Sequence, residues 1–414
     1  MKRIRGARRG VRWLAALAVL ALVGAVAAQS LTFWSWRTED VDAYDQFIAA
    51  FHQDHPAIDV TFTPYKNTEY NTILSTALQG GGGPDIVHLR AYGGMEPLAD
   101  AGLLVPLGGK VAALKDFDPN VLKAATDRAD GKVYGVPFAL QTVQVLYNKD
   151  VFAKLGLSEP KTWQEFLDVA RKIKASGIDA LANGSKDSWT VETLFGGVAP
   201  AFYGCNAFYD RMAAGTATFE DPAFKTSLQR MVDLEPYLAS NYQGVAYSDM
   251  QSLFAYGQAG MFIGGSYELA TLAQLNPDLK IGSFLIPDEQ GNSCETFYVD
   301  GSYGINASSQ HQDADVAFID FLASKRYGQM FTDTLKQISA VPGVLPTDPA
   351  LATMADRMQK EGTPYLMLTL FRFGTPSGST LLQNEMQAVL AGSQTVDQAA
   401  ANIQRGVASW YTFH

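Results

Sequence analysis

The first 90 residues alternate between strand and helix patterns. Of all features of the sequence, this order most restricts the set of possible folds. Residues 31–36, the segment around Val60 and residues 85–89 have the short apolar runs of buried strands. Between them, residues 41–51 and 69–79 carry apolar side chains at helical spacing. Strands that alternate with helices form parallel sheets covered by helices. The sequence therefore predicts an α/β fold.

The rest of the chain continues this alternation without an internal repeat or an obvious linker. Residues 162–165 have the sequence of a capping box and predict a helix that runs to about Ala175. Residues 261–264 and 281–286 predict short strands, and residues 315–322 predict a helix. Because no linker separates the parts, we expect domains that share several chain crossings.

A parallel sheet also predicts where a ligand binds, because ligands sit beyond the carboxyl ends of the strands. The segments 36–40, 64–67 and 90–94 follow the first three predicted strands and should face such a crevice. The glycine run 80–83 precedes a strand instead, and it lacks the lysine of a phosphate-binding loop. We interpret this run as a plain turn.

The N-terminus predicts an export signal. Six basic residues within the first twelve positions precede the apolar run 13–23, and small residues 24–28 end the segment. A permanent anchor is the alternative, but the run falls short of the ~20 residues that span a bilayer. We expect cleavage near Ala27 or Ala28 and a periplasmic or secreted mature protein. No cysteine lies near this site, so a lipoprotein is not expected.

Charge and missing motifs exclude several classes of function. Without the six N-terminal basic residues, 26 basic residues stand against 42 acidic ones, a balance of -16, which is unfavourable for nucleic-acid binding. The motifs G-x-S-x-G, H-E-x-x-H and C-x-x-C do not occur. We therefore expect no catalytic residue, no metal site and no cofactor. A carboxylate pair of a secreted glycosidase remains an open alternative.

The two cysteines, Cys205 and Cys294, allow two interpretations. Outside the inner membrane a disulfide persists, and it would close a loop of about 90 residues worth ~4 kcal/mol in the chain-entropy model. Two separate buried thiols remain the alternative.

Aromatic residues, at 11% of the chain, suggest a class of ligand. Several fall in predicted loops beside glycine, serine or charged residues, namely Tyr92, Trp189, Tyr267, Phe371 and Phe373. An aromatic face offers an apolar platform for the C–H side of a sugar ring, while neighbouring polar side chains can bond the hydroxyl groups. Each aromatic alone is as compatible with core packing.

Several short motifs occur in an order that carries a family resemblance. They occupy residues 31–36, 83–87, 93–94, 131–137, 146–150, 261–267, 286–287 and 390–397. Together with the export signal, this array resembles bacterial extracellular solute-binding proteins, most closely the maltose-binding family 1 group that serves ABC sugar importers. It covers nearly all of the mature chain.

The resemblance implies two α/β lobes of the type II periplasmic-binding-protein-like fold, joined by a hinge at Phe138 and Ala139. It implies lobe one over residues 29–138 and about 300–345, and lobe two over residues 139–299 and about 346–414. A sugar would be held between the lobes and delivered to the permease subunits of an ABC importer. The family expectation is a monomer without enzymatic activity.

The resemblance and the aromatic residues together nominate a ligand site. For stacking on the sugar we expect Trp36, Trp189 and Tyr267, and for bonding its hydroxyls Glu39, Arg90, Gln141, Asp300 and Arg372. Arg37, His88 and Tyr92 lie in the same predicted ligand loops. Ser379 and Gln383 depart from the maltose-binding pattern, so maltose itself is not assumed.

Other functions remain open on the same fold. Arg37, Arg90 and Arg372 would suit an anionic ligand such as a glycerol phosphate ester, although the charge of -16 disfavours steering an anion. A sensory or adhesive sugar-binding module is a further alternative.

Overall fold

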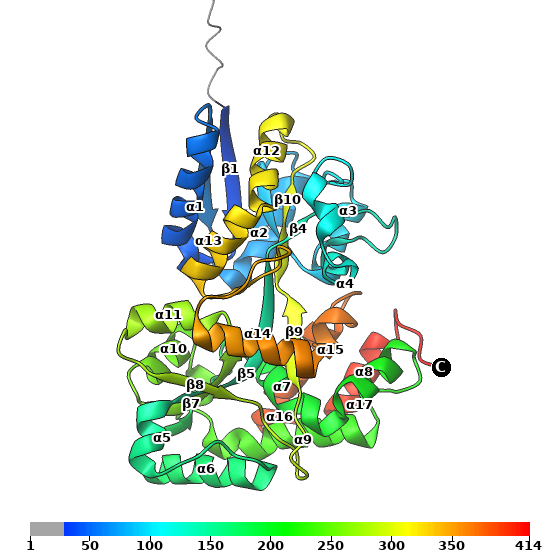
Figure 1. Cartoon of the computed structure of the whole chain (residues 1–414). Coiled ribbons are helices and arrows are strands. Elements are labelled where there is room, and N and C mark those ends of the chain that lie inside the picture. The colour runs from blue at the N-terminus through cyan, green and yellow to red at the C-terminus, as the bar shows by residue number, and fades with distance from the viewer. Residues whose placement is uncertain (1–28) are drawn as a thin grey trace, which may run out of the picture.

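The chain forms two lobes, one above the other in Figure 1. This computed structural model describes residues 29–414, so the predicted export signal at residues 1–28 lies outside the described residues. Within residues 29–414, no helix combines the length and the apolar character that a membrane span requires.

Lobe one is built on a five-stranded sheet in the order β2-β1-β3-β10-β4. Its strands are β1 Gln29–Ser35, β2 Ile58–Pro64, β3 Ile86–Arg90, β4 Val136–Pro137 and β10 Gly301–Ile305. Its helices are α1 Val41–Asp54, α2 Asn67–Gln79, α3 Glu96–Asp100, α4 Pro119–Leu122, α12 Gln312–Leu322 and α13 Lys325–Leu335. β1 pairs in parallel with β2 and β3, which confirms the predicted parallel arrangement, and β10 is antiparallel to β3.

The core of lobe one follows from the two periodicities of the sequence. Along β1, Leu31 and Phe33 are fully buried, whereas the alternate residues Ser30 and Thr32 are exposed and half-buried. Along α1, Tyr44, Phe47 and Phe51 are fully buried, and the rings of Phe33 and Tyr44 meet edge to face at 5.4 Å. Apolar residues at strand and helix spacing therefore form one packed layer between α1 and the sheet.

Lobe two is built on a seven-stranded sheet in which β5 is the central strand. Its strands are β5 Ala139–Asn148, β6 Asp179–Leu181, β7 Ala259–Gly265, β8 Ile281–Phe284, β9 Glu295–Val299, β11 Ile338–Ser339 and β12 Gly362–Pro364. Its helices are α5 Lys149–Leu155, α6 Trp163–Ala175, α7 Ser188–Tyr203, α8 Cys205–Ala213, α9 Pro222–Leu234, α10 Tyr247–Ala255, α11 Glu268–Leu275, α14 Pro349–Glu361, α15 Leu366–Thr369, α16 Gly378–Leu390 and α17 Val396–Val407.

The predicted capping box of α6 forms only in part. Thr162 is the N-cap, and its hydroxyl accepts the backbone N–H of Glu165 at 3.3 Å. The Glu165 carboxylate accepts the N–H of Lys161 at 2.8 Å rather than that of Thr162. The reciprocal bond that completes a capping box is thus shifted by one residue.

Three segments cross between the lobes side by side. The chain passes from β4 to β5 at Phe138, from β9 to β10 at Asp300, and from α13 to β11 before Ala340. Phe138 donates its backbone N–H to Gly301 at 3.2 Å and accepts that of Ala340 at 2.9 Å, and Asp300 donates to Ala139 at 3.1 Å. The crossings are therefore bonded to one another as one strip of backbone.

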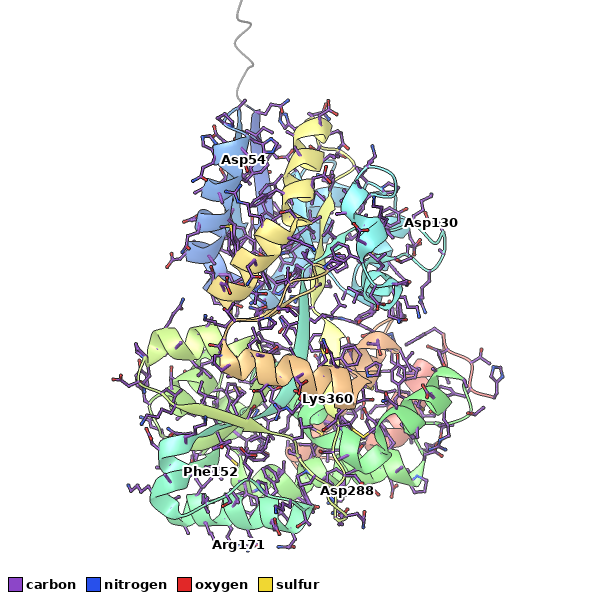
Figure 2. The ribbon with its side chains drawn as sticks, viewed as in Figure 1. Asp54, Asp130, Phe152, Arg171, Asp288 and Lys360 are labelled. Atoms are coloured by element: carbon purple, nitrogen blue, oxygen red, sulfur yellow. A yellow bond between two sulfur atoms is a disulfide. The ribbon has the colours of Figure 1, made fainter. Side chains whose placement is uncertain are left out.

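The outer faces carry exposed ion pairs. Asp54 of α1 pairs with Arg326 of α13, and Arg171 and Lys360 each pair with an acid on their own helix, at Asp168 and Asp356. Figure 2 labels Asp54, Arg171 and Lys360 on these faces. Such solvated pairs contribute little to stability, about 0–1 kcal/mol each.

A disulfide joins Cys205 and Cys294, with their Cα atoms 6.2 Å apart. Cys205 begins α8, and Cys294 lies directly before β9. The bond therefore ties a peripheral helix of lobe two to the strand that leads into the second crossing.

Replacing both cysteines, as Cys205→Ser with Cys294→Ser, should lower the free energy of unfolding by ~4 kcal/mol. The physical reason is the loss of a covalent loop closure across 89 residues in the unfolded chain. Chemical denaturation of the mature chain would measure the change. The wild-type protein in reducing agent is the control and should unfold at the denaturant concentration of the double variant. Equal midpoints for the oxidised wild type and the double variant would contradict the prediction.

Candidate functional site

A buried arginine organises the polar side chains that lobe one presents between the lobes. Arg37 follows β1, and its guanidinium contacts three carboxylates, those of Glu39 at 3.6 Å, Asp300 at 3.2 Å and Asp40. Asp300 lies on the second crossing, far from Arg37 in sequence. Burial raises the pKa of Asp40 to about 6, and the Arg37 charge opposes this rise. The arginine therefore holds the loop after β1 to the crossing and is itself neutralised by its neighbours.

Trp36 and His88 form a packed support below this surface. The Trp36 side chain is only 3% exposed, and its ring centroid lies 5.0 Å from that of His88. His88 is fully buried, with its Nε2 atom 3.1 Å from the Tyr44 hydroxyl. Burial, followed by the charges of Arg37 and Arg90, lowers the pKa of His88 well below its ordinary value. As placed here, Trp36 offers little ring surface for stacking and His88 is a neutral core residue.

Arg90 lies over the Trp36 ring, with its guanidinium carbon 3.8 Å from the ring centroid. Its Nη2 donates to the backbone oxygen of Asn67 at 3.2 Å and to the Asn67 Oδ1 at 2.9 Å, and its Nε donates to Asn71 at 3.2 Å. Burial, and next the charge of Arg372, lowers the pKa of Arg90 to about 9, so the group stays protonated at neutral pH. Neutral acceptors and an aromatic face thus hold this cation in place.

Lobe two contributes an aromatic group around a buried acid. The rings of Trp189 and Tyr247 meet edge to face at 4.6 Å, and the Tyr247 hydroxyl donates to Glu268 at 3.1 Å. Tyr267, next to Glu268, places its hydroxyl 3.5 Å from that of Thr193. Burial raises the pKa of Glu268 to about 8, and the charge of Glu39 from lobe one adds to this rise. The charge of a lobe-one residue therefore acts on this buried acid of lobe two.

The lobes touch at a second place, where Arg372 and Phe373 of lobe two meet the loop after β3. A Cβ atom on Gly93 would lie 2.6 Å from the backbone oxygen of Arg372, so only glycine permits this approach. The guanidinium of Arg128 lies 3.4 Å from the centroid of the Phe373 ring. Tyr92 makes a further contact between the lobes, since its hydroxyl accepts the N–H of Val299 at 3.2 Å.

The structure brings most of the nominated residues to the surfaces between the lobes, but not Gln141. Gln141 is fully buried; its amide nitrogen donates to Gln337 at 2.7 Å and its oxygen accepts from Ser266 at 2.8 Å. As placed, it has no free polar atom for a ligand. Arg37, Glu39 and Asp300 form one group; Trp36, His88 and Arg90 form a second; Trp189 and Tyr267 belong to the aromatic group; and Tyr92 and Arg372 lie at the second contact.

Sequence reasoning missed four residues of this region. Tyr247 and Glu268 belong to the aromatic group, and Tyr298 on β9 packs against Tyr365 at 5.7 Å between ring centroids. Glu268 and Tyr298 carry a local signal, because Glu268 directly follows the nominated Tyr267 and Tyr298 lies two residues before the nominated Asp300. The others come from separate helices and loops, so no spacing in the sequence brings them together.

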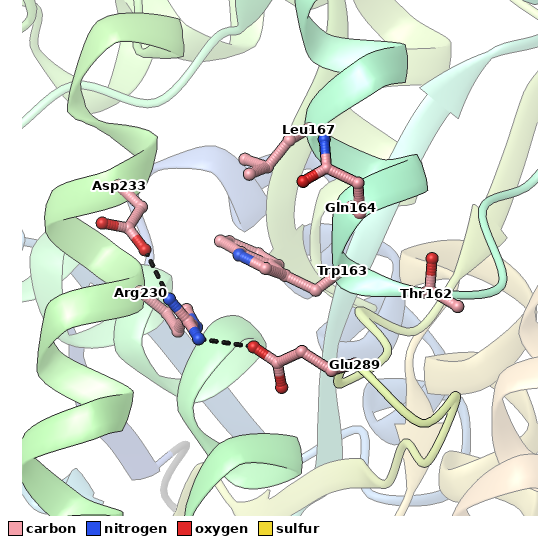
Figure 3. A pocket seen from close by; sticks show the side chains of 7 residues that line it. All are labelled: Thr162, Trp163, Gln164, Leu167, Arg230, Asp233 and Glu289. Atoms are coloured by element: carbon pink, nitrogen blue, oxygen red, sulfur yellow. Dashed lines mark hydrogen bonds and ion pairs between the residues drawn. The ribbon is translucent and has the colours of Figure 1, made fainter.

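A hollow of about 350 Å³ lies elsewhere on lobe two, between α6, α9 and the loop that carries Glu289 (Figure 3). Figure 3 shows Trp163 beside Arg230, which pairs with Asp233 at 2.8 Å and with Glu289. None of the nominated ligand residues lines this hollow.

Glu268→Gln should make the protein less sensitive to alkaline pH. Burial raises the pKa of Glu268 from its ordinary value of 4.5 to about 8, so the folded protein keeps a proton that the unfolded chain has released. Stability from this group is fully present below pH 4.5 and is lost as pH rises through 8. We expect the variant to match the wild type at pH 5 and to exceed its free energy of unfolding by about 2–4 kcal/mol at pH 9.

Denaturant titrations at the two pH values would measure this difference. Glu220→Gln, at an exposed turn, is the matched control and should leave the difference unchanged. An equal effect of pH on Glu268→Gln and on the wild type would contradict the prediction.

Comparisons with known proteins identify the family. The model of the bacterial extracellular solute-binding proteins matches residues 34–329. The multiple sugar-binding protein of Streptococcus mutans is 25% identical over 325 residues, 76% of each chain. The diacetylchitobiose binding protein of Streptomyces coelicolor is 27% identical over 318 residues, 73% of this chain and 71% of that protein.

Solved structures agree on the fold. A chitin oligosaccharide binding protein superposes with a TM-score of 0.79 at 23% identity, over 92% of this chain and 98% of that one. The family model covers well over half of the sequence, and the motifs quoted above lie in order along it. The chain belongs to the bacterial extracellular solute-binding protein family.

Proposed function

We propose that this protein captures a saccharide between its two lobes and delivers it to the permease of an ABC importer. The observation that carries the proposal is the pair of facing surfaces, polar on lobe one and aromatic on lobe two, joined by three bonded crossings. The relatives described above are named as sugar-binding proteins, and these names support the same class of ligand.

Each surface supplies one part of saccharide recognition. Glu39 and Asp300 offer carboxylate oxygens to sugar hydroxyls, and Arg37 fixes the position of both. Trp189 and Tyr267 are half-buried, so each keeps ring surface for the apolar side of a pyranose. We assign Trp36, His88 and Gln141 a positioning role, because their side chains are packed within the protein.

Binding then drives closure without chemistry. A saccharide that contacts both lobes binds the closed form more tightly than the open form and shifts the population towards it. The closed protein would present both lobes together to the membrane subunits. We further propose that it acts as a secreted monomer after cleavage near Ala27 or Ala28, without a lipid anchor and without catalytic activity.

A thermal-shift screen of residues 29–414 against mono-, di- and oligosaccharides tests the function. The protein is first unfolded and refolded to remove any ligand bound during expression. A sugar at 100 times its Kd adds about 2.7 kcal/mol of stability and should raise the Tm by several degrees. Small-angle scattering with the same sugar should show a smaller radius of gyration. If no saccharide raised the Tm, the proposal would be overturned. Release of reducing sugar would indicate a glycosidase instead.

Tyr267→Ala should weaken binding of the saccharide found in that screen by about tenfold or more. The reason is the loss of a stacking surface worth at least about 1.4 kcal/mol. Isothermal titration calorimetry would measure the Kd of both proteins. Tyr256→Ala is the matched control, because Tyr256 is 59% exposed and lies at the end of α10, outside the nominated residues. An unchanged Kd for Tyr267→Ala would remove Tyr267 from the site.

A further inference from the structure

Two arginines between the lobes, Arg90 and Arg372, differ from Arg37 in their surroundings. Within residues 29–414, neither Arg90 nor Arg372 has a carboxylate within 4.0 Å, whereas Arg37 has three. Arg90 donates only to the neutral groups of Asn67 and Asn71, and the Arg372 side chain makes no hydrogen bond in the described chain. Both residues are half-buried. Cations in this position cost free energy that a bound anion would offset.

The two arginines approach each other from opposite lobes. Arg90 ends β3 of lobe one, and Arg372 follows α15 of lobe two. The position that a Cβ atom would take on Gly94 lies 2.5 Å from the Arg90 Cβ and 3.7 Å from the Arg372 Nε. The absence of a side chain at Gly94 therefore lets the two arginine side chains share one corner of the interface.

The acids of this corner are already engaged. Asp300 pairs with Arg37 at 3.2 Å, and Glu192 accepts the Gln383 side-chain amide at 2.7 Å. Burial raises the pKa of Glu192, and the charge of Arg372 opposes this rise. Neither acid stands within ion-pair distance of Arg90 or Arg372 in residues 29–414. Within residues 29–414, the two guanidinium groups of this corner thus have no carboxylate in direct contact.

A hollow of about 260 Å³ opens beside Arg90 in lobe one. Gly94 and Arg90 line it, together with uncharged residues of α2 such as Asn71 and Ser75. His88, which also lines it, is neutral because burial lowers its pKa. Among the described residues that line the hollow, Arg90 is therefore the one charged group. The hollow belongs to lobe one, and Arg372 does not line it. Its volume is several times the ~30 Å³ that a water molecule occupies, so it gives room for an oxyanion beside Arg90.

We propose that the captured saccharide carries an oxyanion substituent, a carboxylate or a phosphate ester, which Arg90 and Arg372 hold from the two lobes. This inference rests on the proposed function and names the class of sugar. Guanidinium groups bind such anions through paired, charge-assisted hydrogen bonds. Because one arginine comes from each lobe, the anion would favour the closed form directly.

Matched ligands test the inference by isothermal titration calorimetry. The pairs are glucose with glucuronate and galactose with galacturonate, and glucose 6-phosphate separates a phosphate ester from a carboxylate as the source of the oxyanion. We expect at least one acidic sugar to bind about tenfold or more tightly than its neutral partner. Its affinity should fall as NaCl rises, because salt screens the charge contacts.

Substitution of the two arginines tests the site. Arg372→Gln and Arg90→Gln should each reduce the ratio of acidic to neutral affinity by about tenfold or more. Arg372→Gln removes no bond of the described chain, so its Tm without ligand should stay close to that of the wild type. Arg326→Gln, in a surface pair with Asp54, is the control and should preserve the ratio.

The outcomes separate this inference from the proposed function. If neutral sugars bind as tightly as acidic ones, the inference is wrong, but the proposed capture of a saccharide is unaffected. A preference for acidic sugars that survives both substitutions overturns the assignment to Arg90 and Arg372. Binding of inorganic phosphate as tight as that of any sugar overturns the sugar acid as the ligand. If no saccharide of either kind binds, the proposed function itself fails.

Discussion

The strip of three hydrogen-bonded crossings is the constraint on which the rest of the structure depends. Phe138 is bonded to both of the other crossings, so the segments hold each other at a fixed lateral spacing. Leu140, just beyond, packs against buried apolar residues of both lobes. Motion of one lobe against the other is thus confined to backbone rotations along one strip, which is how hinge closure operates. The same strip carries Asp300 into the site.

Charge between the lobes is divided unevenly, and this division has consequences for the ligand. Around Arg37, three carboxylates surround one cation, so its contribution is to position Glu39 and Asp300. Around Arg90 and Arg372 there is no such compensation within the described chain. A ligand whose hydroxyl groups bond to Glu39 and Asp300, and whose anionic group binds Arg90 and Arg372, would satisfy both parts of the site.

Local patterns predicted the elements well, because hydrophobic periodicity reports directly on which face of a helix or strand is buried. The helix predicted over residues 41–51 is α1, and the strand over residues 261–264 is β7. Errors lie at the ends: α2 begins at Asn67 rather than at Glu69, and β8 ends at Phe284 rather than at Ile286. End residues depend on caps and neighbouring strands, as the shifted bond of Glu165 shows.

The sequence by itself determined the α/β class, the parallel arrangement of the first strands, the family and the loops that meet between the lobes, since order and periodicity encode these. Only the tertiary structure decided what each side chain does there. Trp36 is an aromatic in a predicted ligand loop, yet it is buried because Arg90, Tyr70 and His88 cover its ring. Arg372 lies in an inconspicuous loop, yet it approaches Arg90 and, within residues 29–414, has no carboxylate within ion-pair distance. Burial and pairing are set by contacts between segments far apart in sequence, which no local pattern records.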